Sequence, residues 1–182
     1  MKILIEKLRK NHSKLVYFIF FFYFVIGVLT FKNYGISIDE KFQRYSGFFW
    51  LKYLLNFTNF EYLKEAVNLK ILSISDYTLP NIHQNLKYSI FFDVPFALTE
   101  VIFKVEDSKT YFEIRHFFNF FIFFLSSIYF YKLLRNRFLN YNVSIVGLVF
   151  YILSPKIYGA SFYNNKDIIF LSLLVVSIYY FF

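Results

Sequence analysis

Long apolar stretches separated by charged segments form the main pattern of the chain. The first of them, LVYFIFFFYFVIGVLTF at residues 15–31, has 17 residues and no charge. As a helix rising 1.5 Å per residue it reaches about 26 Å, which is near the lower limit for crossing a bilayer. Similar stretches follow at residues 117–134, 143–155 and 168–182. The pattern predicts an all-α integral membrane protein with about four transmembrane helices, and Pro155 is expected to end or kink the third.

The first and last stretches raise separate questions. The basic start of the chain is also typical of a cleaved signal peptide, but the apolar core is too long and residues 31–34 (FKNY) are a poor cleavage site. We therefore expect a retained anchor. The last stretch ends without a polar cap after only 15 residues. It is expected to be truncated, with the chain forming the N-terminal part of a longer polytopic protein.

Charge distribution predicts the orientation of these helices. The net charge is +8. Residues 1–14 carry five basic side chains and one acidic one, and three more basic side chains lie around residues 132–137. Residues 32–116 carry ten of each sign. Because short basic segments stay in the cytoplasm, the tail at 1–14 and the turn at 135–142 are expected there. Residues 32–116 and 156–167 are then extracytoplasmic.

The long extracytoplasmic loop at residues 32–116 has apolar parts of its own. Residues 42–55 and 88–103 are rich in aromatic side chains and leucine. The second range could form a further span, but it would bury Asp93 and Glu100, each at about 2.5–3.5 kcal/mol near the bilayer centre. Pro95 would also interrupt its hydrogen bonding. Both ranges are therefore expected to form helices on the membrane surface.

Composition excludes several classes of function. Apolar residues make up 58% of the chain and charged residues 18%, so a disordered chain is excluded. The chain has no cysteine, which excludes disulfides, thiol nucleophiles and cysteine-ligated metals. It also lacks P-loop, GxGxxG, GxSxG and HExxH motifs. The positive charge is explained by topology, and no motif for nucleic-acid binding accompanies it.

An acidic pair follows the first apolar stretch closely. Asp39 and Glu40 lie just outside the expected membrane exit, where a carboxylate can act as a general base or ligate a cation beside a lipid-borne substrate. Residues 37–40 (SIDE) also have the S-x-x-E form of a capping box, which would begin a helix. Both interpretations stay open. A divalent cation is compatible with the pair, but the sequence defines no cofactor and no metal site.

Further polar residues gather at the expected outer ends of the spans. Lys166 and Asp167 lie between the third and fourth, where a lysine can neutralise a phosphate or simply anchor the helix at the interface. Arg115 and His116 precede the second span and can bind a phosphate, shuttle a proton or form a polar collar. Asp93, within an apolar run, indicates either a site or a surface ion pair.

Three stretches carry a resemblance to a known family. They are residues 34–40 (YGISIDE), residues 88–93 together with Arg115 and His116, and residues 154–167 (SPKIYGASFYNNKD). In this order they resemble the beginning of a GT-C membrane glycosyltransferase of the protein O-mannosyltransferase and lipid A aminoarabinose transferase branch, family 39-like. The third stretch is similar to the SPR-F-F-G-H-x-F-F-N-P-K-D pattern of bacterial members. Lys156 replaces its arginine, Ala160 its histidine and Asn165 its proline.

The resemblance implies a specific reaction. Such enzymes pass a sugar from a polyprenyl-phosphate donor to a hydroxyl of a lipid, glycan or protein acceptor on the extracytoplasmic face. Asp39 matches the general base, with Glu40 as its neighbour. The donor phosphate is then expected at Lys166, with Arg115 and His116 as further candidates and Asp93 and Asp167 in support.

The implied location is a bacterial inner membrane, with the N-terminus in the cytoplasm. As a fragment, the chain is expected to be inactive if the missing part supplies further phosphate contacts. Two alternatives are a transporter or flippase, which would require charges or breaks inside the spans, and a non-catalytic membrane assembly subunit.

Overall fold

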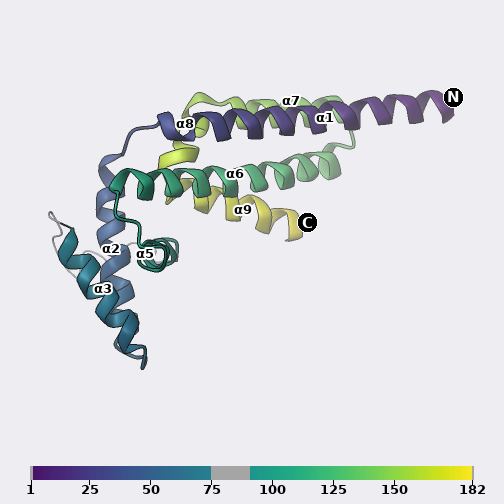
Figure 1. Ribbon diagram of the computed structural model, residues 1–182. Helices are drawn as coiled ribbons and strands as arrows, with labels where there is room; N and C mark the ends of the chain where they lie inside the picture. The colour runs from purple at the N-terminus through teal and green to yellow at the C-terminus, as the bar shows by residue number, and fades with distance from the viewer. Residues whose placement is uncertain (1, 75–90, 182) are drawn as a thin grey trace. The chain divides into compact units, whose positions relative to one another are not determined.

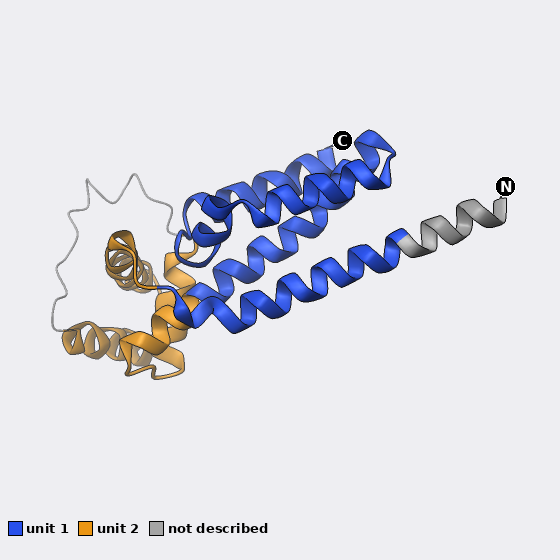
Figure 2. Ribbon diagram, turned by 90° about the horizontal axis from the view of Figure 1, so that it is seen from above, with its two compact units in different colours: residues 1–34, 116–182 blue, residues 35–115 orange. Residues whose placement is uncertain are grey.

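The computed structural model describes residues 2–74 and 91–181, with side chains from residue 12 onward. Every regular element in these ranges is a helix, and no strand occurs among them (Figure 1). The chain divides into two compact units, residues 1–34 with 116–182 and residues 35–115 (Figure 2). We call them the span unit and the loop unit. The all-helical prediction is confirmed for the described residues.

The span unit consists of long apolar helices that run alongside one another (Figure 2). Its helices are α1 (Lys2–Thr30), a 3-10 turn (Phe31–Asn33), the larger part of α6 (Ser108–Phe138), α7 (Tyr141–Leu153), α8 (Pro155–Tyr163) and α9 (Asp167–Phe181). Aromatic rings fill its core, where the buried rings of Phe120 and Phe162 stack with centroids 5.1 Å apart. Gly27 lets α1 approach α6, because a Cβ at this position would overlap the Phe120 ring. Packing of rings against a small residue thus holds this unit together.

Length and composition give two or three candidate membrane spans. Residues His12–Asn33 and Ser108–Phe138 are each long and apolar enough to cross a membrane. A third span results if α7 and α8 are one bent span, since they meet at an angle of 56°. The break falls between Leu153 and Pro155, as the sequence predicts, because proline clashes with the preceding turn and lacks an N–H. The predicted count of about four is not confirmed, since the apolar helix α9 has 15 residues.

The loop unit contains α2 (Ile38–Leu55), α3 (Glu61–Ser73), α5 (Asp93–Ile102) and the first turns of α6. Helices were expected at residues 42–55 and 88–103, and α2 and α5 occupy most of these ranges; residues 88–90 lie outside the described part. Helix α3 was not expected. Its Val67 joins Phe48, Leu51, Leu55 and Ala97 in a buried apolar cluster, and Leu63 and Ile71 of the same helix pack against this cluster partly buried.

Helix α6 begins where the sequence places polar residues, well before the apolar stretch at 117–134. Asp107 accepts hydrogen bonds from the backbone N–H groups of Lys109 (3.1 Å) and Thr110 (3.2 Å) and from the Thr110 hydroxyl. The Lys109 N–H is the main cause that holds the pKa of the Asp107 carboxyl below its usual range. At pH values above the ordinary aspartate pKa, this cap stabilises the start of the helix. The stabilisation is lost as the pH falls through the lowered pKa of Asp107.

Gly47 allows α2 and α5 to pack closely. A Cβ at this position would overlap the backbone oxygen of Asp93, which cannot rotate away as a side chain would. We expect Gly47→Ala to lower the free energy of unfolding by about 1–3 kcal/mol through overpacking, although alanine favours a helix by about 1 kcal/mol. Thermal unfolding in detergent measures the change. Gly159→Ala, a helical position with open space around it, is the matched control; a Gly47→Ala protein as stable as this control would contradict the prediction.

Candidate functional site

The acidic pair after the first span is divided by the structure into two different environments. Glu40 is fully buried, and its Oε2 accepts a hydrogen bond from the Ser37 N–H at 2.7 Å in a complete capping box. Asp39, one residue earlier in the first turn of α2, is exposed. The capping interpretation is therefore confirmed for Glu40, whose carboxylate serves the helix start. Asp39 is the member of the pair that solvent or a substrate can reach.

Asp93 and Arg115 form a buried ion pair in the loop unit. The Arg115 guanidinium is fully buried and donates to Asp93 Oδ1 and to the Tyr111 hydroxyl. Gln43 Oε1 accepts a further hydrogen bond at 3.5 Å, and Glu40 adds a favourable charge interaction. Of the two interpretations of Asp93, the structure shows the ion pair, but the pair is buried and does not lie at the surface as the sequence predicts. It also explains why an aspartate is found within an apolar run, since a buried carboxylate needs such a partner.

A second charged cluster centres on Glu100, which is 1% exposed. Arg44 donates to both of its oxygens, through Nε at 3.1 Å and through Nη2. The Lys70 ammonium lies 3.3 Å from Glu100 Oε1 and also donates to the Val105 carbonyl. Two cations therefore share one carboxylate. The sequence signals this cluster only indirectly, through the high cost of burying Glu100 without a partner.

Tyr111 lies between the two charged clusters. Its ring centroid is 4.8 Å from the Arg44 guanidinium carbon and 5.8 Å from that of Arg115. An aromatic face attracts a cation, and more strongly where water is excluded. Residues Gln43, Arg44, Lys70 and Tyr111, none of which sequence reasoning selected, thus belong to one polar network inside the loop unit. Gln43 and Arg44 have partners more than 50 residues away in the chain, and although Tyr111 and Arg115 are only four residues apart, no known motif marks that spacing.

A polar cavity of about 280 Å³ opens beside the Glu100 cluster. Its lining includes three cationic side chains, one acidic side chain and three hydroxyls: Lys41, Arg44, Lys70, Glu106, Tyr45, Ser73 and Ser108. Arg44 Nη1 donates to the Ser108 hydroxyl at 3.2 Å. The cavity is therefore lined by donors that have an excess of positive charge.

The remaining predicted residues belong to the span unit. His116 is 2% exposed. Lys166 is exposed in the turn before α9, and Asp167 is exposed as the first residue of that helix. Asn164 Oδ1 accepts hydrogen bonds from the backbone N–H groups of Lys166 (3.3 Å) and Asp167 (2.9 Å), and its amide donates to Asp167 Oδ2 at 2.9 Å. Asn164 and Asp167 together thus cap the start of α9, which is the structural interpretation of this turn.

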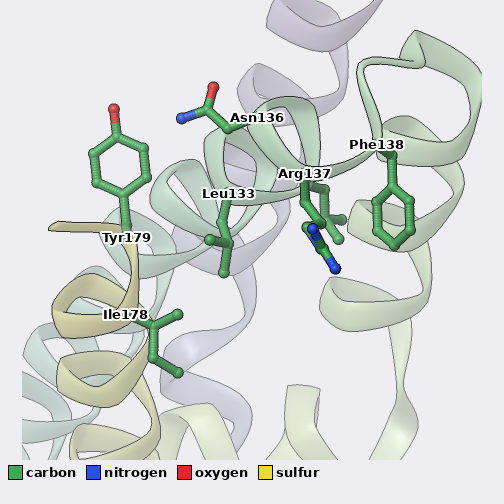
Figure 3. Close-up of a pocket in the computed structure, with 7 residues that line it drawn as sticks. Leu133, Asn136, Arg137, Phe138, Ile178 and Tyr179 are labelled. Carbon is green, nitrogen blue, oxygen red and sulfur yellow. The ribbon is translucent and has the colours of Figure 1, made fainter. Parts of the chain in front are cut away.

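Two cavities of the span unit are apolar. One of about 580 Å³ lies between the ends of α6 and α9, with Leu133, Arg137 and Phe138 on one side and Ile178 and Tyr179 on the other (Figure 3). The other, of about 560 Å³, lies between α1 and the α7–α8 break. Within the described ranges, no group of three or more histidine, aspartate or glutamate side chains is placed to hold a metal ion.

Fold and site together define a helical protein with apolar helices suited to a membrane and a separate loop unit built around buried charges. Comparison of the chain with protein-family models, with curated proteins and with solved structures gives no match. A function for the chain is therefore inferred from its own residues and their arrangement.

Proposed function

We propose that the chain is part of a membrane glycosyltransferase of the GT-C type, which moves a sugar from a polyprenyl-phosphate donor to an acceptor hydroxyl on the extracytoplasmic face. The observation that carries this proposal is the exposed carboxylate of Asp39, directly after the first candidate span. The neighbouring Glu40 side chain accepts the Ser37 N–H in the capping box and so fixes the first turn of α2, on which Asp39 lies. A general base needs this combination of access and a fixed backbone.

In the proposed reaction Asp39 removes the proton from the acceptor hydroxyl as its oxygen attacks the anomeric carbon of the sugar. The new carbon–oxygen bond forms while the bond from that carbon to the donor phosphate breaks, and the polyprenyl phosphate leaves with the electron pair. Negative charge grows on the phosphate during this step, so a nearby cation stabilises the transition state. The acceptor is a lipid, glycan or protein hydroxyl.

Lys166 is the best candidate for the donor phosphate. It is exposed, and the turn that carries it is held by the Asn164 and Asp167 cap. Arg115 already donates to Asp93 and Tyr111, and His116 is buried, so both would meet a phosphate only after rearrangement. Asp93 then acts as a positioning residue for Arg115. The proposed location is a bacterial inner membrane with a cytoplasmic N-terminus, as the charge distribution favours.

A transporter or a non-catalytic assembly subunit is the alternative. The break between α7 and α8 is the feature that favours a transporter, because interrupted helices are common at transport sites. Neither alternative requires the carboxylate of Asp39, which therefore distinguishes them from the transferase.

Replacing Asp39 tests the proposed function. We expect Asp39→Asn to lower sugar transfer by about 100-fold or more, because the amide cannot accept the hydroxyl proton. The measurement uses membranes containing the full-length gene product and a panel of radiolabelled polyprenyl-phosphate hexoses and pentoses. Glu65→Gln, an exposed acid of α3, is the matched control and should retain activity. Normal transfer by a well-expressed Asp39→Asn protein would eliminate the assignment.

A further inference from the structure

We propose that the polar cavity beside the Glu100 cluster, lined by α2, α3 and the start of α6, binds an oxyanion of the phosphate-monoester class. The cavity holds about 280 Å³. A water molecule occupies about 30 Å³ of liquid, so a phosphate group with part of its hydration shell fits. This proposal concerns a binding site and does not rest on glycosyl transfer.

The charge around the cavity favours an anion. Lys41, Arg44 and Lys70 line it, and the Glu100 carboxylate is shared by Arg44 and Lys70. Glu106 also lines the cavity but is exposed. Three cations thus face two carboxylates, one of which is screened by water. The excess positive charge faces a cavity whose floor includes the buried Arg44 and Phe112, and near such buried groups charge interactions are stronger than in bulk solvent.

Two cationic donors of the cavity, Arg44 and Lys70, are held in place before any ligand arrives. The Arg44 guanidinium is fixed by Glu100 and lies over the rings of Tyr111 (4.8 Å) and Phe112 (6.0 Å). Lys70 is fixed by Glu100 and the Val105 carbonyl. Donors that are ordered in advance lose less entropy on binding.

Hydroxyl groups complete the lining and favour phosphate among anions. Ser108 accepts its hydrogen bond from Arg44, so its own O–H proton can be donated to a ligand. The Tyr45 side chain contributes a further hydroxyl, whereas the Ser73 hydroxyl already donates to the Lys70 carbonyl at 2.7 Å. A phosphate monoester presents three acceptor oxygens and close to two negative charges, which matches several cations and hydroxyls better than a carboxylate does. Such a group can come from a lipid headgroup or from a soluble phosphorylated molecule.

The test measures phosphate binding to the purified full chain and to a variant of its most accessible cation. Lys41 is exposed on α2, so Lys41→Gln should leave folding unchanged. In nanodiscs of neutral lipid, isothermal titration with glycerol phosphate is expected to show saturable binding that weakens as salt is added. Lys41→Gln should lower the affinity about tenfold, the effect of losing one charged contact. Lys52→Gln, an exposed lysine later in α2, is the matched control and should bind as the unmodified chain does.

Two arms of the test distinguish the sources of the phosphate. Binding of glycerol phosphate in neutral nanodiscs indicates a soluble ligand. Binding that appears only as protection of Lys41 from amine labelling in nanodiscs containing phosphatidic acid indicates a lipid headgroup. Absence of both effects, or an equal loss in Lys41→Gln and Lys52→Gln, would overturn the proposal. Asp39→Asn should leave phosphate binding intact, so failure of the proposed transferase activity and failure of this site are separable.

Discussion

Arg115→Met is expected to lower the free energy of unfolding by about 3–5 kcal/mol, the range measured when one partner of a buried ion pair is removed. The methionine fills much of the same volume but leaves the Asp93 carboxylate buried without its main partner. The Tyr111 hydroxyl and Gln43 also lose their contacts with the guanidinium. The loss of the charge therefore matters far more than any change in packing.

Unfolding of the full chain in detergent, followed by circular dichroism, measures this effect. Arg137→Met is the matched control, because Arg137 is an exposed arginine near the other end of the same helix. The control should change stability by less than about 0.5 kcal/mol. Adding Asp93→Asn to Arg115→Met should restore part of the lost stability, since no uncompensated charge is then buried. Equal stability of the Arg115 and Arg137 variants would show that the pair does not hold the loop unit.

Glu100→Gln is the second change with a large expected effect. The amide keeps the size of the side chain and one acceptor, but it removes the charge that Arg44 and Lys70 share. Lys70 can turn toward solvent, whereas Arg44 is buried and cannot. We expect a loss of about 3 kcal/mol, at the low end of the range for broken buried pairs.

The control for this change is Glu106→Gln. Glu106 is an exposed acid that lines the same cavity without contacting the buried cluster. Its replacement should leave the unfolding temperature nearly unchanged. If the Glu100→Gln and Glu106→Gln variants had the same unfolding temperature, the sharing of one carboxylate by Arg44 and Lys70 would contribute nothing to stability.

Local signals in the sequence predicted the elements that depend on local physics. The apolar stretch at residues 15–31, the capping box at Ser37 and the break at Pro155 each depend on a few neighbouring residues, and the structure contains all three. Helix α3 gave no such signal, because polar and apolar residues are mixed along it, and its burial depends on how Leu63, Val67 and Ile71 pack against the cluster formed with α2 and α5.

The charged network of the loop unit could be predicted only in part. Asp93 within an apolar run indicated that a partner was needed, but the partner, Arg115, lies 22 residues away in the chain. The Arg44–Glu100 contact joins residues 56 apart. Pairs of this kind depend on how helices pack, and no spacing in a single sequence encodes them. For the same reason Glu40 could not be recognised as buried before the packing of α2 was known.

The bend at Pro155 has a consequence for any bilayer around the span unit. Proline has no N–H, so the carbonyl of Tyr151, four residues earlier, lacks its usual helical donor. If α7 and α8 are one bent span, this carbonyl lies in hydrocarbon, which offers no replacement donor, and leaving it unsatisfied there costs several kcal/mol. In that case we expect water to reach the Tyr151 carbonyl through a local defect in the lipid, or a polar neighbour to donate the missing hydrogen bond.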